Sequence, residues 1–335
     1  MKYILSTFVF IFLVQAHAAS LLNELFAEKR FKQNIMPTVT VPGELGEPAD
    51  IFLGAWLDDN TLILNNIIPS EQPKWKWKKK VVIWNHEKRE VHTLMENAYM
   101  QCVNELAGHV KIESDSVSKL YAINVQDLSL DEIVKSEWKK NQCVDFFEVP
   151  KEKRGYRLPY HKSYIEFGVS NISGAYRGNA FVVNENGWRK EMDMPANYVE
   201  YPTYDRYVNK YWLAVSSYNT SSAPMKKSML YLVDKEGDVE KIKLPEYYME
   251  EIGLIRKAFF TRKGILIDSS GGRVKSSHYS GLFLLAGNDV IRVYDRDDNV
   301  VFIGASPNGC NVAFLELKNY SLSSRKTVKI INFCE

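Results

Sequence analysis

The turn Ser306-Pro307-Asn308-Gly309, followed by the strand Val312-Ala313-Phe314, is the stretch that decides the fold. Pro307 presets the second position of a type I turn, Asn308 tolerates the bridge region after it, and Gly309 takes the positive φ that closes the turn into a strand pair. Looser versions of this turn-and-strand pattern recur at intervals of about fifty residues. A hairpin repeated in this way predicts a radial or stacked β architecture.

Five apolar segments carry the repeat. Each leads into a polar turn or ends on a polar residue: Val81–Trp84 before Asn85, Phe181–Val183 before Asn184, Tyr231–Val233 before Asp234, Leu282–Leu285 before Gly287-Asn288, and Lys329–Asn332 near the end of the chain. From Asn184 to Asp234 is about 50 residues, but from Asn85 to Asn184 is about 100. One irregular copy is therefore expected between Asn85 and Asn184.

A further hairpin precedes each of these segments. Two examples are Ile51–Leu57 with Leu62–Ile67 around the turn Asp58-Asp59-Asn60, and Lys257–Thr261 with Ile265–Asp268 around Arg262-Lys263-Gly264. Four strands in about 40 to 50 residues form the blade of a β-propeller, and about six such units fill the chain. The Ser306–Gly309 turn before an apolar strand also resembles the blades of bacterial propellers of the TolB and WD40-like families. That resemblance implies an all-β fold, which we assign to a single domain over residues 19–335.

The two ends of the repeat region predict how the propeller closes. The last unit stops at Phe333-Cys334 after its third strand, whereas Ile35–Val41 is an extended segment with no hairpin partner beside it. We expect Ile35–Val41 to complete the last blade and thereby bury an edge that would otherwise be free to aggregate.

Two helices are also expected. Ser20 is placed as the N-cap of a short helix that ends at Lys32. Ser129 and Glu132 have the spacing of a capping box, and Lys139-Lys140 would close a second helix near its negative dipole end, inserted in the irregular unit.

The start of the chain has the features of a secretory signal. A charged Lys2 precedes the apolar run Ile4–Val14, and Ala16-His17-Ala18 supplies the small residues read by a signal peptidase. Because the apolar run is shorter than the roughly 20 residues that span a bilayer, a signal peptide over residues 1–18 is favoured over a retained anchor. We therefore expect a periplasmic or secreted protein without a membrane span.

Four cysteines remain beyond the signal segment, and in an oxidising compartment an even number favours disulfides. Cys310 opens one strand and Cys334 closes the next, so antiparallel pairing predicts a bond between them. Cys102 with Cys143 follows by exclusion. The rival interpretation is a metal site, but these cysteines lack the spacing typical of zinc ligands, and no metal is predicted.

The segment Lys74–Lys80 is the densest cluster of cations and aromatics. As a strand it would place Trp75 and Trp77 on one face and Lys76, Lys78 and Lys80 on the other. It is a candidate platform for a sugar ring, an anionic glycan or a lipid headgroup. The alternative is a strand entry whose tryptophans pack and whose lysines protect an exposed edge.

A row of tyrosines recurs every third residue at Tyr198, Tyr201, Tyr204 and Tyr207. Pro202 argues against one uninterrupted helix, so this row is not a helical stripe. The rings are candidates for a face that binds carbohydrate or peptide, or else for packing between blades.

Catalytic motifs are scarce in the sequence. It has no Gly-x-Ser-x-Gly elbow, Walker loop, dinucleotide fingerprint or His pair with metal-ligand spacing, so no catalytic residue and no cofactor is predicted. Asp295, Asp297, Asp298 and Asn299 form a weak candidate for calcium. Carboxylates such as Glu166, Glu200 and Asp205 would support glycan hydrolysis if two of them met about 5 to 10 Å apart in a central cavity.

The sequence therefore predicts an exported β-propeller that binds rather than catalyses, presenting a loop face to a protein, a peptide or a cell-envelope glycan. The alternative is a cell-envelope polysaccharide hydrolase or lyase with carboxylates in the central cavity, because propellers host both kinds of function. A formal net charge of +2 gives no reason to expect nucleic acid as a partner.

Overall fold

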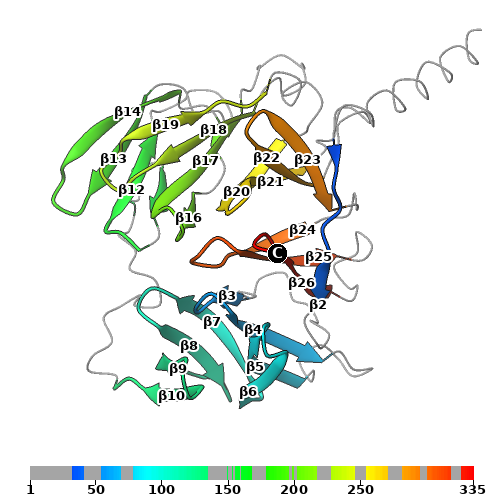
Figure 1. Cartoon of the computed structure of the whole chain (residues 1–335). Coiled ribbons are helices and arrows are strands. Elements are labelled where there is room, and N and C mark those ends of the chain that lie inside the picture. Colours follow the sequence, from blue (N-terminus) through cyan, green and yellow to red (C-terminus); the bar gives the residue numbers. More distant parts are fainter. Residues whose placement is uncertain are drawn as a thin grey trace, which may run out of the picture.

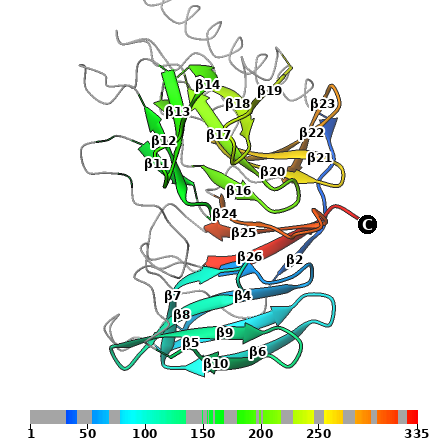
Figure 2. The ribbon, with the colours of Figure 1, turned by 90° about the vertical axis from the view of Figure 1, so that its left-hand side faces the viewer.

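The computed structural model describes the following residues: 32–40, 54–68, 78–134, 149, 153, 155–158, 160–167, 179–195, 198–199, 202–216, 228–245, 254–270, 281–294, 300–317 and 326–335. Every regular element in these ranges is a β-strand. The strands form six sheets that succeed one another along the chain (Figures 1 and 2). No helix in the described ranges could cross a membrane.

The first three sheets are meanders in which each strand pairs with the next. Sheet 1 contains β3 (Gly54–Trp56), β4 (Thr61–Ile68), β5 (Lys78–Asn85) and β6 (Glu90–Glu96). Sheet 2 contains β7 (Ala98–Asn104), β8 (His109–Ser114), β9 (Val117–Asn124) and β10 (Ser129–Glu132). Sheet 3 contains β11 (Gly155–Leu158), β12 (Ser163–Phe167), β13 (Asn179–Asn184) and β14 (Arg189–Pro195). Sheet 2 occupies the place of the copy expected between Asn85 and Asn184, and its four strands form a regular meander.

The next three sheets repeat the meander with additions. Sheet 4 contains β15 (Tyr198–Val199) and β16 (Thr203–Asp205), both paired with β17 (Lys210–Ser216), then β18 (Ser228–Val233) and β19 (Val239–Ile242). Sheet 5 contains β20 (Leu254–Thr261), β21 (Gly264–Ser270), β22 (Gly281–Ala286) and β23 (Asp289–Tyr294). Sheet 6 contains β24 (Val300–Ala305), β25 (Asn311–Leu317) and β26 (Lys326–Asn332). Six successive four-stranded units are the architecture of a six-bladed β-propeller.

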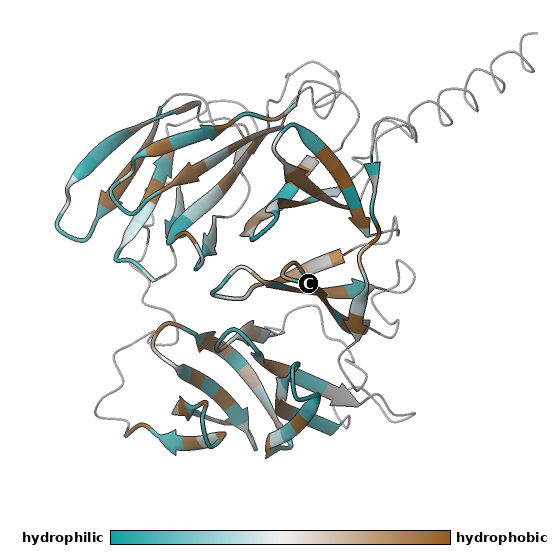
Figure 3. Cartoon of the chain, viewed as in Figure 1, coloured by the Kyte–Doolittle hydropathy of each residue, from teal (hydrophilic) through white to brown (hydrophobic). Residues whose placement is uncertain are grey.

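Apolar side chains hold neighbouring sheets together, and Figure 3 shows hydrophobic residues along the strands of the sheets. Successive residues of an inner strand point to opposite faces, so Leu62 and Ile63 enter different clusters. Five clusters of buried residues join sheets 1 and 2, 3 and 4, 4 and 5, 5 and 6, and 6 and 1. One large buried member of each cluster is, in the same order, Met100, Tyr211, Trp212, Phe314 and Trp84. Among the described residues, none of these clusters joins sheet 2 to sheet 3. The apolar core is thus a series of layers between blades.

An Asx turn explains why a polar residue follows the third strand of the repeat. The side-chain oxygen of this residue accepts a backbone N–H two to four positions later, which fixes the turn locally. The structure shows this bond at Asn85, Asn124, Asn184, Asp234 and Asn332. The recurring Asn or Asp is therefore a structural part of the repeat.

The Ser306–Gly309 turn adopts the predicted conformation and joins three sheets. Gly309 has a φ of 72°, and its N–H donates to the Ser306 carbonyl at 2.9 Å. The Asn308 N–H donates to the Asp59 carboxylate of sheet 1 at 2.8 Å, and the Arg262 N–H of sheet 5 donates to the Gly309 carbonyl at 3.0 Å. The turn that signals the repeat thus also connects sheet 6 to both of its neighbours.

The N-terminal segment runs along sheets 5 and 6. β1 (Lys32–Gln33) pairs in parallel with β23, and β2 (Thr38–Thr40) pairs antiparallel with β26, with Val39 opposite Ile330. Sheet 6 accordingly takes its outer strand from the opposite end of the chain, as Ile35–Val41 was predicted to provide. The predicted pairing of that segment with the last sheet is confirmed.

The disulfide between Cys310 and Cys334 is also confirmed, with a Cα–Cα distance of 5.2 Å. It lies at the open end of the β25–β26 hairpin, where the Phe333 N–H donates to the Cys310 carbonyl. Cys102 is disulfide-bonded as well. Its predicted partner, Cys143, lies outside the described residues.

The prediction of a second helix that starts at Ser129 is wrong for the part of that segment that the structure describes. Ser129–Glu132 is strand β10, paired with β9 so that Leu130 lies opposite Ile123. The capping-box spacing misled because the Asp127 side chain accepts the N–H and the hydroxyl of Ser129 and closes a hairpin turn. Lys139-Lys140 lie outside the described residues. So does the helix predicted from Ser20, apart from Lys32, which begins β1.

Candidate functional site: the central cavity

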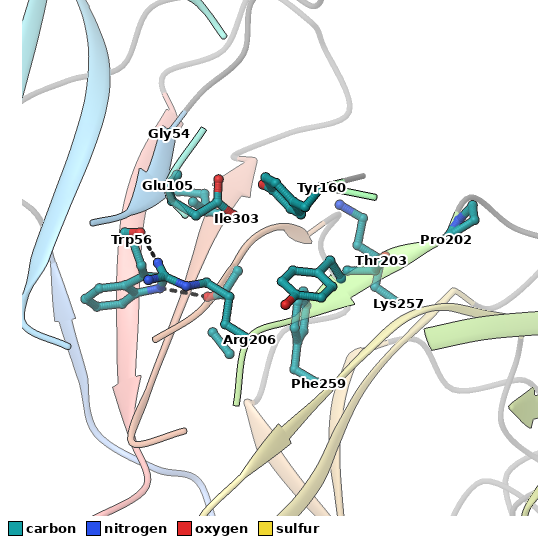
Figure 4. A pocket seen from close by; sticks show the side chains of 14 residues that line it. Gly54, Trp56, Glu105, Tyr160, Pro202, Thr203, Arg206, Lys257, Phe259 and Ile303 are labelled. Carbon is teal, nitrogen blue, oxygen red and sulfur yellow. Dashed lines mark hydrogen bonds between the residues drawn. The ribbon is translucent and has the colours of Figure 1, made fainter. Parts of the chain in front are cut away.

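A cavity of about 240 Å³ lies where the innermost strands of the six sheets converge (Figure 4). Each sheet contributes at least one residue to its wall, in order Trp56, Glu105, Tyr160, Arg206, Lys257 and Gly304. Glu105, Tyr160 and Arg206 lie in the turns that follow β7, β11 and β16. Each turn leads into the next strand of its sheet, which is β8, β12 or β17. The cavity is therefore at the end of the fold where the first turns of the blades gather.

Hydrogen bonds across the cavity tie distant parts of the chain together. The Trp56 indole N–H donates to the Gly304 carbonyl at 2.9 Å, which joins sheet 1 to sheet 6. Arg206 Nη1 donates to the Trp56 carbonyl at 2.7 Å, which joins sheet 4 to sheet 1 (Figure 4). These bonds leave most of the guanidinium donors of Arg206 available on the cavity side, since this is its one hydrogen bond within the described part of the chain.

Glu105 and Tyr160 form a hydrogen-bonded pair in the cavity wall. Burial raises the pKa of the Glu105 carboxyl, and the Tyr160 hydroxyl and the charge of Arg206 oppose that rise. Burial also raises the pKa of Tyr160, so its hydroxyl stays protonated and donates to Glu105. Tyr160 has a φ of 67°, a conformation that non-glycine residues rarely adopt and that is often found at functional sites.

Lys257 brings a second cation to the cavity. Burial lowers the pKa of its ammonium group, and the nearby charge of Asp268 opposes this. Its Nζ makes one long hydrogen bond, 3.4 Å to the Phe302 carbonyl. Asp268 is itself engaged by Arg256, whose Nη2 lies 2.7 Å from Oδ1. The negative charge of Asp268 is therefore compensated by both Arg256 and Lys257, and Arg256 is the closer of the two.

Asp268 gives the stability of the fold a measurable pH dependence. Burial raises the pKa of Asp268 from 3.8 to about 6, although Arg256 and Lys257 oppose the rise. Because the folded state holds the proton more tightly than the unfolded state, the contribution of Asp268 to the free energy of unfolding is greatest below pH 4 and falls as the pH rises to about 6. We expect the wild type to lose up to about 3 kcal/mol relative to Asp268→Asn between pH 4 and pH 7.

Urea unfolding of both proteins across this pH range measures the difference. Asp131→Asn, which changes an exposed aspartate of β10, provides the control and should follow the wild type at every pH. A difference between wild type and Asp268→Asn that is flat, or that grows in favour of the wild type with rising pH, would show that this carboxyl is not buried as the structure has it.

The predicted tryptophan and lysine platform is described only in part. Trp75, Lys76 and Trp77 lie outside the described residues, so the platform stays a prediction. Lys78 is exposed at the start of β5, and the Lys79 ammonium lies 4.6 Å from the Tyr99 ring centroid. β5 lies between β4 and β6, but Lys78 and Lys79 pair with β4 alone, so the alternative of lysines protecting an exposed edge also stays a prediction.

The tyrosine row divides between two roles where its side chains are described. Tyr204 lines the cavity and packs against Tyr160 at a centroid distance of 5.0 Å. Tyr207 instead lies against Gly309 and beneath the guanidinium of Arg262. Tyr198 is placed in β15 without a described side chain, and Tyr201 lies outside the described residues.

Two of the three carboxylates that were candidates for hydrolysis, Glu166 and Asp205, do not line the cavity. Glu166 lies in β12 and pairs with Arg189 and Lys153 at 3.0 and 3.3 Å. Asp205 is buried and serves as an acceptor between sheets 4 and 5. Glu200 and the predicted calcium turn at Asp295–Asn299 lie outside the described residues, and no group of potential metal ligands occurs in the described ranges.

Sequence reasoning did not identify Glu105, Tyr160, Arg206 or Lys257. Three of them occupy blade turns and one occupies an inner strand, and each stands alone in sequence without a periodic pattern. The position directly after the first strand of a blade is a partial signal, because it lines the cavity in sheets 2 and 4 but not in sheets 1, 5 and 6. In sheets 2 and 4 this position carries the charged Glu105 and Arg206.

Comparisons with known proteins give distant structural likenesses that carry no argument about fold or function. No protein-family model and no curated protein matches the sequence. Among solved structures, an acylaminoacyl peptidase of Pyrococcus horikoshii is 12% identical with a TM-score of 0.39, covering 83% of this chain and 43% of its own. The β-propeller domain of the Trilobed protease from Pyrococcus furiosus is 14% identical with a TM-score of 0.36, covering 83% and 82%.

A phage phi92 endosialidase is 9% identical with a TM-score of 0.32, covering 87% of this chain and 57% of its own. This chain thus spans less than half of the length of the peptidase and somewhat more than half of the endosialidase. We transfer no residue role from these structures. The six sheets described above identify the fold as a β-propeller, as the sequence predicted.

Proposed function

We propose that this protein is an exported binding protein that presents the end of its propeller, with the central cavity in the middle, to a peptide or cell-envelope glycan. The observation that carries the proposal is the convergence of all six sheets on one cavity whose wall combines aromatic surface with a few polar groups. Such composition is typical of ligand sites. The disulfide between Cys310 and Cys334 supports an oxidising compartment.

A binding role fits the wall better than glycan hydrolysis does. Glycosidases place two carboxylates on either side of the scissile bond. Glu105 is the one carboxylate among the described wall residues, and the Tyr160 hydroxyl already engages it. Glu166 and Asp205 are committed to ion pairs and hydrogen bonds elsewhere.

Native mass spectrometry with a mixture of envelope-derived peptides and oligosaccharides tests this function. We expect one-to-one complexes in which the mass of the ligand is unchanged after prolonged incubation. Ala305→Phe, which fills the cavity, should abolish these complexes, whereas Ala107→Phe on an exposed turn should not. Ligands cleaved or altered in mass by the wild-type protein would contradict a binding role and favour the hydrolase or lyase.

A further inference from the structure

The charges of the cavity wall are unbalanced toward the positive. Among the described wall residues, Arg206 and Lys257 are cations and Glu105 is the one acid. Burial favours the neutral forms of both Glu105 and Lys257, and Asp268, which does not line the cavity, partly compensates the Lys257 ammonium. An anionic occupant would bring a further negative charge next to Lys257 and so favour its charged form.

Within the described residues, both cations also have donors without protein partners. The ammonium group of Lys257 carries three N–H donors and uses one of them there, in a 3.4 Å contact with the Phe302 carbonyl. The guanidinium of Arg206 carries five donors and uses Nη1 for the Trp56 carbonyl at 2.7 Å, which also fixes its position. Figure 4 shows the guanidinium of Arg206 turned toward Trp56 and the ammonium end of Lys257 on the other side of the cavity. A lysine with free donors suits a carboxylate.

The size and walls of the cavity limit what the carboxylate is attached to. A volume of about 240 Å³ lies below the usual range for drug-sized ligands, so it accommodates one compact unit. Tyr204 and Phe259 supply aromatic surface, and Glu105 offers an acceptor for a hydroxyl or ammonium group. A small polar body with an acidic group fits this combination.

From these contacts we propose that the cavity binds the carboxylate of a compact acidic ligand through Lys257. An acidic sugar unit and an acidic amino acid share this chemistry. The inference rests on the proposed function and deepens it, since it specifies the group that the binding protein recognises. Lys257 is the primary anion contact because its donors are less engaged than those of Arg206.

Isothermal titration at low ionic strength with three probes tests the proposal: D-galacturonate, L-aspartate and D-galactose. D-galactose has the same ring as D-galacturonate with a hydroxymethyl group in place of the carboxylate. We expect at least one acid to bind at least about tenfold more tightly than D-galactose, since a charge-assisted hydrogen bond contributes about 1.5 to 3 kcal/mol. Whichever acid binds more tightly identifies the source of the carboxylate.

Variants assign the contact to Lys257. Lys257→Met should weaken binding of the acid at least about tenfold, whereas Lys88→Met, on an exposed turn of sheet 1, should leave it unchanged. If circular dichroism shows that Lys257→Met does not fold, Lys257→Gln replaces it in the same measurement. Equal binding of D-galactose and D-galacturonate, no binding of either acid, or unchanged affinity in a folded Lys257 variant would overturn the proposal. Chemical conversion of a bound probe would instead contradict the proposed function and leave the recognition of its carboxylate standing.

Discussion

Asp205→Ala is expected to lower the free energy of unfolding by about 4 kcal/mol. The buried carboxylate accepts hydrogen bonds from Trp212 Nε1 at 2.8 Å, the Phe260 N–H at 2.7 Å and the Tyr207 N–H at 3.0 Å, and the Val208 N–H is a further donor. Trp212 lies in sheet 4 and Phe260 in sheet 5, so one side chain fastens two sheets. Alanine removes the acceptor of the first three donors, and a buried donor left unpaired costs about 1 to 3 kcal/mol.

Urea unfolding followed by tryptophan fluorescence measures this loss. Asp205→Asn keeps one acceptor oxygen and removes the buried charge, so we expect a loss about half as large. Asp131→Ala, at an exposed position, should change stability by less than about 0.5 kcal/mol. Wild-type stability in Asp205→Ala would mean that these three donors find other acceptors and that Asp205 does not join the two sheets.

Removing the N-terminal strands should have an effect of similar size, through sheet 6. A chain that starts at Val41 lacks β1 and β2, and with them the hydrogen bonds from the Asn34 and Met36 N–H groups to sheet 5 and the pairing with β26. At about 0.5 to 1.5 kcal/mol for each net hydrogen bond, the loss is about 4 kcal/mol. The uncovered edge of β26 should also promote association between molecules.

Thermal unfolding and size-exclusion chromatography of this chain, compared with one that starts at Ala19, measure both effects. Lys32→Met provides the control, because it removes the exposed ion pair with Asp289 and retains both strands. That variant should differ from the parent by less than about 1 kcal/mol. A truncated chain as stable and as monomeric as the parent would mean that the N-terminal strands do not complete the sheets.

The repeat was predictable from the sequence because its signals are local. The Asx turn after the third strand of a blade depends on one side chain and its own backbone, as at Asn184 and Asp234. The pairing of Thr38–Thr40 with the last sheet was predictable by exclusion, since one unit lacked a strand. The same local logic failed at Ser129, where a capping-box spacing and a hairpin turn call for the same residue types.

The cavity was not predictable because its chemistry is non-local. Trp56 and Gly304 meet although about 250 residues separate them in the chain, and Arg206 contacts Trp56 across about 150 residues. Asp205 shows the converse. Its tyrosine-rich surroundings suggested a binding face or a catalytic acid, yet its partners Trp212 and Phe260 give it a structural role. Asp205 and Arg206 are adjacent in the sequence, and only the folded structure shows that Arg206 lines the cavity whereas Asp205 does not.

The central claim is that six four-stranded sheets surround the cavity and that the last of them is shared by both ends of the chain. Hydrogen exchange of the β26 amides tests it most directly. Within β26, Lys329–Ile331 are flanked by both β25 and β2, and their amides should be protected as well as those of β25. Exchange in β26 as fast as in β19, an outermost strand with one neighbour, would contradict the claim.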